Sequence, residues 1–340
     1  MKKKLITMGE LLLRFTPPGH DRFLQADTYE VAFGGAEANV AVSAENYGID
    51  ASYVTKLPDN EVGQAAINSL KRLGIETENI ARGGKRIGTY YFERGAGLRP
   101  SKIIYDRENS AIAEADPDDF DWDKIFDGVD WFHFSGITPA LSKNARDVSL
   151  RALKEAKKKG VRISVDLNYR SRMWTLEEAG KSMDELCHYA DVCITSDDDA
   201  EIFSMYPEDA EIPDGKPDLW NFRSVCTALK KRFDFDEVCV MRRRSLSATK
   251  ALWDSMLLDS VDFHFGKKYD VDVIDTVGCG DAFCGGFIAA ELLGFSPQDK
   301  IDFASAAGCL KHTISGDFNM VTKDEVIALM GGDSSGAVKR

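Results

Sequence analysis

The chain lacks the features that would place it on a membrane or on nucleic acid. It has no basic excess, because 43 lysines and arginines stand against 56 aspartates and glutamates, a formal net charge of −13. No apolar run is long enough to cross a bilayer, and Gly9 and Glu10 interrupt the apolar segment that follows the N-terminal lysines. Nucleic acids and anionic membranes bind basic surfaces, so we expect neither as a partner.

Paired cysteines and metal-binding spacings are also missing. The seven cysteines are an odd number spread through apolar segments, and no Cys-x-x-Cys or His/Cys ligand spacing occurs. This distribution is typical of buried free thiols in a reducing compartment, so we expect a cytoplasmic protein. The remaining composition is ordinary for a globular enzyme, with 340 residues of which 44% are hydrophobic and 29% charged.

The most informative stretch is residues 275–281, Asp-Thr-Val-Gly-Cys-Gly-Asp, between a β-branched run and a helix of small residues. The amides of Gly278, Cys279 and Gly280 can turn toward a ligand at the helix N-terminus and form an anion hole. Asp281 lies beside it on the first helical turn. A carboxylate there can accept the proton of a hydroxyl that attacks the bound anion, which indicates phosphoryl transfer to an alcohol. The plain alternative is a turn in which Asp281 only compensates the helix dipole.

These seven residues resemble the carboxy-terminal signature of the ribokinase-like (PfkB) carbohydrate kinases, commonly Asp-Thr-x-Gly-Ala-Gly-Asp, with Cys279 replacing the alanine. The resemblance extends over nearly the whole chain. It implies an α/β fold, a three-layer α/β/α domain over residues 1–330 with a mainly parallel central sheet and a small β-sheet lid, followed by a flexible tail at 331–340. It also implies that Asp281 is the general base.

A second motif, Gly34-Gly35-x-x-x-Asn39, opens a helix of small residues near the N-terminus. A glycine turn before a tightly packed helix would suffice to explain it. It also resembles the family's amino-terminal motif at the expected position. The resemblance implies that Gly34 and Gly35 approach the sugar and that the Asn39 amide binds its hydroxyls.

Aromatic and β-branched residues alternate with polar ones around Tyr90 and Tyr105, a pattern that indicates strands of a small, half-exposed sheet. The resemblance makes strands from about 12–33 and 87–112 a lid over the sugar. Exposed apolar lid strands imply a homodimer or higher oligomer. Tyr90, Tyr105 and Arg107 are expected to face substrate; the alternative is a tyrosine pair that packs the sheet and a solvated arginine.

From Trp131 onward, strand-like and helical segments alternate regularly, which is typical of an α/β fold with a parallel sheet. The apolar segment that ends at Val165 delivers Asp166, Asn168 and Arg170 at the sheet edge where such folds bind ligands. This Asp-x-Asn-x-Arg segment resembles that of 2-keto-3-deoxygluconate kinases more than that of ribokinases. Arg170 offers a guanidinium to a carboxylate or phosphate, and Asn168 is expected at ATP.

Two segments match the positions of family motifs but depart from their residues. The segment 196–201 has three aspartates at the start of a helix. They either compensate the helix dipole or occupy the position of the family's Asn-x-x-Glu motif, which orders magnesium and phosphate. On the second interpretation Ser196 binds ATP and Asp199 the metal. At 242–248 arginines and serines replace the glycines of the family's phosphate loop and can bind phosphates themselves. The ATP-binding residues expected there are Arg244, Ser245 and Ser247.

The remaining assignments concern the C-terminal third and one insertion. Ser305, in a helix that Pro297 opens, is expected to form a wall for adenine, and the next turn brings Asp317 near the substrate. Gly278 and Gly280 are also expected at the ATP phosphates. Residues 207–217, with three prolines and several acidic residues, are typical of a surface insertion.

The resemblance thus implies phosphorylation of 2-keto-3-deoxygluconate at its 6-hydroxyl with ATP and Mg²⁺. A carboxylate on the sugar explains two arginines at the site of an acidic protein, whereas a neutral sugar does not need them. No sequence feature fixes the sugar's stereochemistry, so a kinase for 2-keto-3-deoxygalactonate stays open, as do fructokinase, ribokinase and nucleoside kinase. A non-catalytic sugar-binding protein of the same fold is the alternative from another class.

Overall fold

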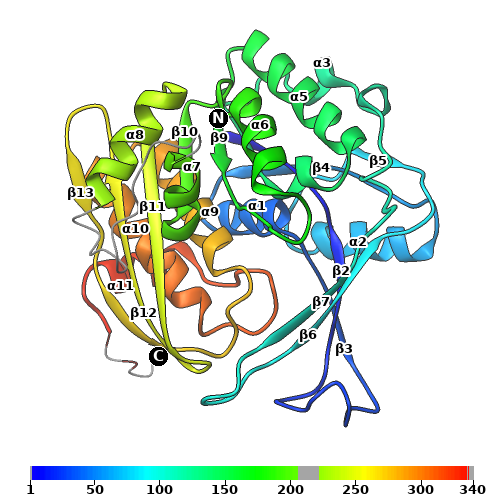
Figure 1. Cartoon of the computed structure of the whole chain (residues 1–340), viewed down its shortest axis with the longest axis horizontal. Coiled ribbons are helices and arrows are strands. Elements are labelled where there is room, and N and C mark those ends of the chain that lie inside the picture. Colours follow the sequence, from blue (N-terminus) through cyan, green and yellow to red (C-terminus); the bar gives the residue numbers. More distant parts are fainter. Residues whose placement is uncertain (1, 206–221, 335, 337–340) are drawn as a thin grey trace.

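The computed structural model describes residues 2–205, 222–334 and 336, and its largest element is a ten-stranded central sheet (Figure 1). The strand order is β13-β12-β11-β10-β9-β8-β1-β4-β5, and β14 pairs with β12. All pairs from β11 to β5 are parallel, whereas β12 adds to β11 in antiparallel direction. The strands are β1 (Lys4–Met8), β4 (Asp50–Leu57), β5 (Ile80–Arg82), β8 (Trp131–Ser135), β9 (Arg162–Asp166), β10 (Val192–Ser196), β11 (Glu237–Ser247), β12 (Lys250–Leu258), β13 (Phe263–Phe265) and β14 (Tyr269–Asp272).

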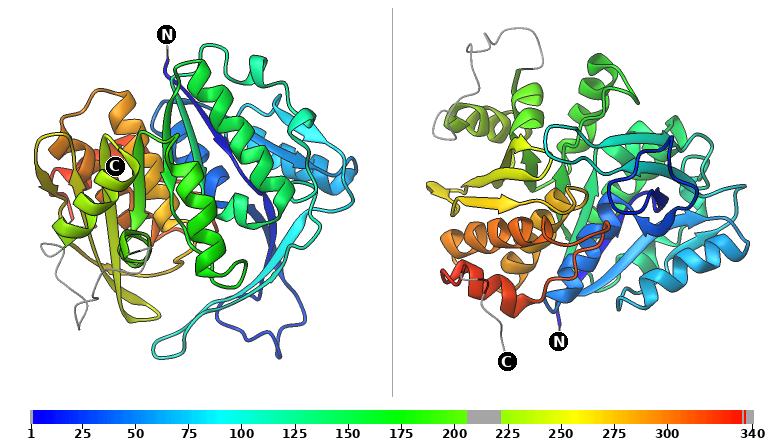
Figure 2. Two further views of the ribbon diagram at one scale, coloured as in Figure 1. Left: turned by 45° about the horizontal axis from the view of Figure 1, so that its top comes forward. Right: turned by 90° about the horizontal axis from the view of Figure 1, so that it is seen from below.

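Helices cover both faces of this sheet (Figure 2). One face carries α1, α2, α9, α10 and α11, and the other carries α5, α6, α7 and α8. The helices are α1 (Ala36–Asn46), α2 (Glu61–Lys71), α3 (Trp122–Ile125), α4 (Ile137–Ala140), α5 (Lys143–Lys158), α6 (Leu176–Cys187), α7 (Asp197–Met205), α8 (Arg223–Phe233), α9 (Cys279–Leu292), α10 (Pro297–Lys311) and α11 (Lys323–Met330), with a short 3-10 helix at Pro117–Asp119.

The central strands are apolar on both faces, as β8 illustrates. All five of its residues are buried. Phe132 and Phe134 belong to the core under α5 and α6, whereas Trp131 belongs to the opposite core with α1 and α9. Successive side chains of a strand point to opposite faces, so a strand covered by helices on both sides needs an unbroken apolar run.

A second, four-stranded sheet, termed the lid, has the order β3-β2-β6-β7. Its strands are β2 (Leu12–Thr16), β3 (Glu30–Gly34), β6 (Gly88–Glu93) and β7 (Lys102–Asp106). The lid extends away from the central sheet at the lower right of Figure 1. Leu12, Tyr90 and Phe92 form its small core, whereas Val31 and Ile104 are 59% and 54% exposed.

These observations confirm the expected α/β fold with a small second sheet, and they correct one element. Residues 242–247 are not a loop but the end of β11, which pairs with β12 in a long hairpin. All seven cysteines are buried and free, as expected. The insertion expected at 207–217 and residues 335 and 337–340 of the expected tail lie outside the described residues. Within the described ranges, no helix is long and apolar enough to cross a membrane.

Candidate active site

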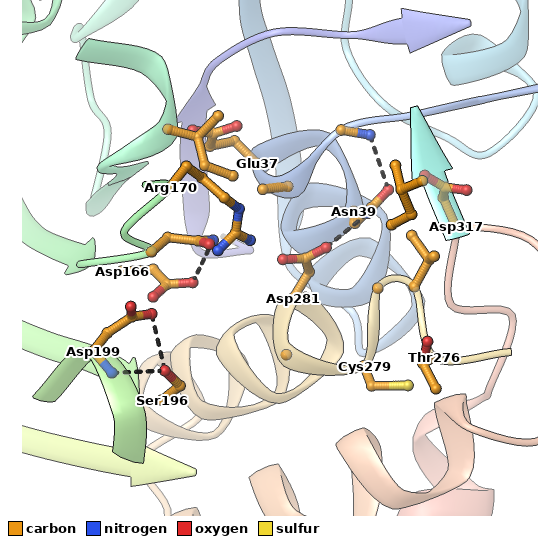
Figure 3. Close-up of a pocket in the computed structure, with 18 of the residues that line it drawn as sticks. Glu37, Asn39, Asp166, Arg170, Ser196, Asp199, Thr276, Cys279, Asp281 and Asp317 are labelled. Carbon is orange, nitrogen blue, oxygen red and sulfur yellow. Dashed lines mark hydrogen bonds between the residues drawn. The ribbon is translucent and has the colours of Figure 1, made fainter. Parts of the chain in front are cut away.

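A cavity of about 450 Å³ lies between the lid and the carboxyl ends of the central parallel strands (Figure 3). It receives side chains from the ends of β9 and β10, from the N-termini of α1 and α9, and from the lid strands β6 and β7. Open parallel sheets bind ligands at this edge. The ionisable side chains that line the cavity are Glu10, Glu37, Tyr90, Tyr105, Arg107, Asp166, Arg170, Asp197, Asp198, Asp199, Arg243, Cys279, Asp281 and Asp317.

The anion loop, residues 276–280, has the geometry that its glycines predict. Gly278 is the N-cap of α9 and lies in the left-handed region at φ +82°. A Cβ there would also lie 2.2 Å from the carbonyl oxygen of Asp317, so both the backbone conformation and the close approach require glycine. No side chain caps this helix. The first amides of α9 are therefore open to an anion in the cavity that Gly278, Cys279 and Gly280 line.

Asp281 follows on the first turn of α9 and points into the same cavity (Figure 3). Its Oδ2 accepts a 2.7 Å hydrogen bond from Nδ2 of Asn39. Burial raises the pKa of Asp281 to about 7, although the bond from Asn39 favours the ionised form. A carboxyl group with a pKa near neutrality can accept a proton from a substrate and release it again, as a general base requires.

The amino-terminal motif lies next to Asp281 and Asp317. Asn39, which is expected at the sugar hydroxyls, lines the cavity; its Oδ1 accepts from the Gly35 amide at 3.4 Å and its Nδ2 donates to Asp281. A Cβ on Gly34 would lie 2.0 Å from Oδ2 of Asp317, and one on Gly35 would lie 2.1 Å from a backbone oxygen. Close packing therefore explains both glycines; Gly35 lines the cavity and Gly34 lies behind Asp317.

The lid places aromatic and cationic groups over the cavity. The rings of Tyr90 and Tyr105 lie 5.7 Å apart on paired strands. The Tyr90 hydroxyl donates to Oδ2 of Asp317 at 2.5 Å. Arg107 donates from Nε to Oε2 of Glu10 at 2.7 Å, and its guanidinium lies 5.3 Å from the Tyr105 ring centre. All five residues line the cavity, so Tyr90, Tyr105, Arg107 and Asp317 lie where they could contact a substrate.

The opposite wall is acidic. Asn168 donates from Nδ2 to Asp166 at 3.0 Å, and the Ser196 hydroxyl donates to Asp199 at 2.9 Å. Burial, followed by the neighbouring carboxylates of Asp199 and Asp281, raises the pKa of Asp166 well above its ordinary value. Burial also raises the pKa of Asp199. Arg170 extends toward these carboxyls in Figure 3.

This wall suits a magnesium ion that is bound together with phosphate. Within the described ranges, no three His, Cys, Asp or Glu side chains are grouped as a ready-made metal site. Mg²⁺ usually keeps several waters and binds through one or two carboxylates plus substrate phosphates. Asp166 and Asp199 are hard oxygen ligands whose crowded negative charge a divalent cation would neutralise, so the donor set fits Mg²⁺.

The hairpin of β11 and β12 presents a different arginine to the cavity from the one expected. Arg242 donates from Nε to Asp254 at 2.9 Å, and Arg244 lies 4.0 Å from the same carboxylate. Arg243 lies between them on the strand, and it lines the cavity. Side chains alternate along a strand. The register therefore gives the cavity Arg243 and turns Arg244 toward Asp254.

Besides Arg244, three further residues expected at ATP do not line the cavity in this structure. Ser245 is exposed, and Ser247 forms hydrogen bonds within its own turn to Thr249. Ser305 is fully buried and bonded to Ser255. The adenine wall expected from Ser305 is thus not formed by that residue here, because α10 turns it into the core.

The comparison with known sequences decides the family. Residues 2–323 match the pattern described as pfkB family carbohydrate kinase. The chain belongs to the PfkB family of carbohydrate kinases. This confirms the resemblance, which rested mainly on the anion loop and the Gly-Gly-x-x-x-Asn motif.

Several proteins of known sequence or structure are similar to this chain. A crystal structure of 2-dehydro-3-deoxygluconokinase from Thermotoga maritima is 44% identical, with a TM-score of 0.93 over 98% of this chain and 99% of that one. A 2-dehydro-3-deoxygalactonokinase from Haloferax volcanii is 32% identical over 99% of each chain. A ribokinase II from E. coli, solved with ATP and Mg²⁺, is 20% identical, with a TM-score of 0.82 over 97% and 99%, and shows the shared fold.

This member of the PfkB family also has a buried charge network that the sequence prediction missed. Arg14 on β2 is 1% exposed and donates to Asp317 and to Asp275, each at 2.7 Å. Glu37, equally buried, accepts from the hydroxyls of Ser135 and Thr138. The signal was present in the sequence, because a charged residue within an apolar strand or helix requires a buried partner.

Proposed function

We propose that this kinase phosphorylates 2-keto-3-deoxygluconate (2-dehydro-3-deoxygluconate) at its 6-hydroxyl with ATP as the donor. The observation that supports this proposal most strongly is that Asp281, beside the anion loop, lines the same cavity as Arg107 and Arg170. A substrate that uses both must offer a hydroxyl to a base and a carboxylate to arginine. The names of the Thermotoga and Haloferax relatives support this class of acid sugar and differ in the epimer.

In the proposed reaction, Asp281 takes the proton of the 6-hydroxyl while that oxygen attacks the terminal phosphorus of ATP. The new O–P bond forms, the bond from this phosphorus to the bridging oxygen breaks, and ADP leaves. The amides of Gly278 to Gly280 bind the charge on the transferring phosphoryl group, and Arg243 binds the neighbouring phosphates. When bound through Asp166 and Asp199, Mg²⁺ would neutralise phosphate charge.

The proposed partners are the acid sugar and ATP, together with a second copy of the chain. The outer face of the lid exposes Val31 and Ile104 on β3 and β7, and exposed apolar strands tend to be covered by a partner. Sedimentation velocity should therefore show a dimer or larger oligomer, and a monomer at micromolar concentration would contradict this.

The seven free cysteines suit a reducing compartment such as the cytoplasm.

Coupled ATP turnover on a substrate panel tests the proposal. The gluconate- and galactonate-derived 3-deoxy keto acids are compared with fructose, ribose and adenosine, and we expect the highest kcat/KM for the gluconate derivative. Higher turnover of the galactonate derivative would reassign the epimer alone. Equal or better turnover of fructose would remove the acid-sugar assignment, and sugar binding without ATP consumption would indicate a non-catalytic sugar-binding protein.

Arg170→Leu should separate acid from neutral acceptors. Arg170 is exposed and donates a hydrogen bond to the Tyr169 carbonyl. Its charge also favours the ionised forms of Asp166, Asp199 and Asp281, so the effect on substrate binding is taken from the difference between acid and neutral acceptors. A charge-assisted bond contributes about 1.5–3 kcal/mol, so kcat/KM for the acid sugar should fall roughly 10- to 100-fold and that for a neutral sugar far less. Arg172→Leu, on the same loop but outside the cavity, is the matched control. Equal losses for both kinds of acceptor would contradict the assignment.

The rate should depend on pH through Asp281. Only the ionised carboxylate can accept the hydroxyl proton, and the pKa of Asp281 is about 7. The log of kcat/KM should therefore rise with pH up to about 7 with a slope near one and level off above it. Sugar carboxylates are already ionised over this range. A flat profile between pH 5.5 and pH 8 would show that a proton acceptor with this pKa does not limit the reaction.

A further inference from the structure

Lys311, the last residue of α10, is a buried cation whose partners are all backbone carbonyls. It is 0% exposed. Its Nζ donates to the carbonyl oxygens of Val277 at 2.8 Å, Ile314 at 3.1 Å and Gly316 at 2.8 Å. An ammonium group has three donor hydrogens, so these three bonds use all of them.

This arrangement differs from that of the other buried lysine on the same helix. Lys300 is 4% exposed and bonds to the carboxylates of Glu237 and Glu291. Over the part of the chain that the structure describes, Lys311 forms no ion pair. Burying a charge without a counter-charge is costly unless dipoles replace its hydration shell. The three carbonyls provide those dipoles, so the pocket around Nζ is a cation site.

The carbonyls belong to two segments that both border the active site. Val277 is part of the anion loop, and Ile314 and Gly316 form the turn that leads to Asp317. The two segments touch, because a Cβ on Gly278 would lie 2.2 Å from the Asp317 carbonyl oxygen and 3.3 Å from Cε of Lys311. The ammonium group thus links the anion loop to this turn, because it donates hydrogen bonds to carbonyls of both segments.

We propose that Lys311 is a tethered cation: it occupies a carbonyl site built like one for a free monovalent cation and thereby positions the amides of Gly278 to Gly280. Carbonyl oxygens arranged around a cation are how proteins replace the hydration shell of K⁺. A side chain that fills this site permanently makes the anion loop independent of K⁺ in solution. The inference rests on the proposed role of the anion loop, and it makes Lys311 a positioning residue.

The test compares monovalent salts in wild type and in Lys311→Met. Methionine keeps the stem as far as Cε and vacates the position of Nζ. Wild-type kcat should stay within about twofold in KCl, NaCl and choline chloride at equal ionic strength. In choline chloride, K311M should lose roughly 10²-fold in kcat, as when an oxyanion donor is misplaced, with a smaller change in the sugar KM. K⁺ or NH₄⁺ should raise the kcat of K311M at least about tenfold above its value in choline chloride, whereas Li⁺ should not.

Lys300→Met is the matched control, since it removes a buried ammonium from the same helix but leaves the three carbonyls filled. Any loss of kcat in K300M should be the same in every salt. Melting temperatures supply a readout that does not depend on turnover: K⁺ should raise that of K311M relative to choline, and should not do so for wild type. If K311M does not fold in choline chloride, recovery of folded protein in KCl supports the proposal and equal failure in all salts overturns it.

Three results would overturn the tethered cation: a wild type that needs K⁺, a K311M variant with normal turnover in choline chloride, or a defect in K311M that no cation relieves. The result of this test is independent of whether the proposed sugar substrate is correct. The salt comparison can be made with whichever sugar the wild type phosphorylates, so a different sugar would change the proposed substrate and leave this test intact.

Discussion

Asp281→Asn is expected to lower kcat about 10²- to 10⁴-fold while leaving the KM of the sugar nearly unchanged. The amide has the size of the carboxylate, and its oxygen can still accept the bond from Asn39. It cannot accept a proton at neutral pH, so only the transition state loses an interaction. The measurement is steady-state kinetics with the preferred acid sugar at pH 8, where the wild-type carboxylate is ionised.

The stability of this variant separates loss of a base from loss of structure. Burial raises the pKa of Asp281 in the folded state above its unfolded value of about 4. The folded state therefore binds the proton more tightly, and wild-type stability falls as pH rises from about 4 to about 7. At pH 8 the neutral asparagine avoids this penalty, so D281N should melt no lower than wild type.

A matched control addresses the alternative in which Asp281 only compensates the dipole of α9. Asp299 also lies on the first turn of its helix, α10, where it accepts a bond from Ser296. Asp299→Asn should leave kcat unchanged. Near-normal turnover in D281N, or an equal loss in D299N, would reduce Asp281 to a helix-end charge.

The parts of the site that the sequence predicts are those encoded by local backbone geometry. A glycine turn before a helix determines where the amides of residues 278–280 point, whatever the rest of the chain does. An apolar run that ends in polar residues likewise determines that Asp166 and Arg170 reach the carboxyl edge of the sheet. Tyr90, Tyr105 and Arg107 could be assigned to one face of the lid because side chains along a strand alternate between two faces.

The parts that could not be predicted depend on register or on contacts between distant segments. One residue of register in the β11–β12 hairpin decides that Arg243, and not Arg244, reaches the cavity. Arg14 meets Asp317 across 303 positions of sequence. α10 is buried on almost every side, so no amphipathic pattern shows which way Ser305 points.

Gly278→Ala should be the most damaging change to the anion loop that leaves every functional side chain in place. At φ +82° a Cβ is strained, and here it would also lie 2.2 Å from the Asp317 carbonyl oxygen, which is backbone and cannot rotate away. The loop must shift, and the amides move with it. Misplacing such donors costs about 10²- to 10³-fold in kcat, measured at saturating sugar and ATP.

Gly294→Ala isolates the cost of the backbone conformation from that of the contact. Gly294 has a similar φ of +76°, but a Cβ there meets nothing within 4 Å. Both variants should lose about 1 kcal/mol of stability to left-handed strain, yet only G278A should lose turnover. If a folded G278A keeps the kcat of G294A, the amides of this loop do not hold the transferring phosphate. If kcat of G278A falls while its KM for ATP stays near that of wild type, the loss lies in the transition state and not in nucleotide affinity.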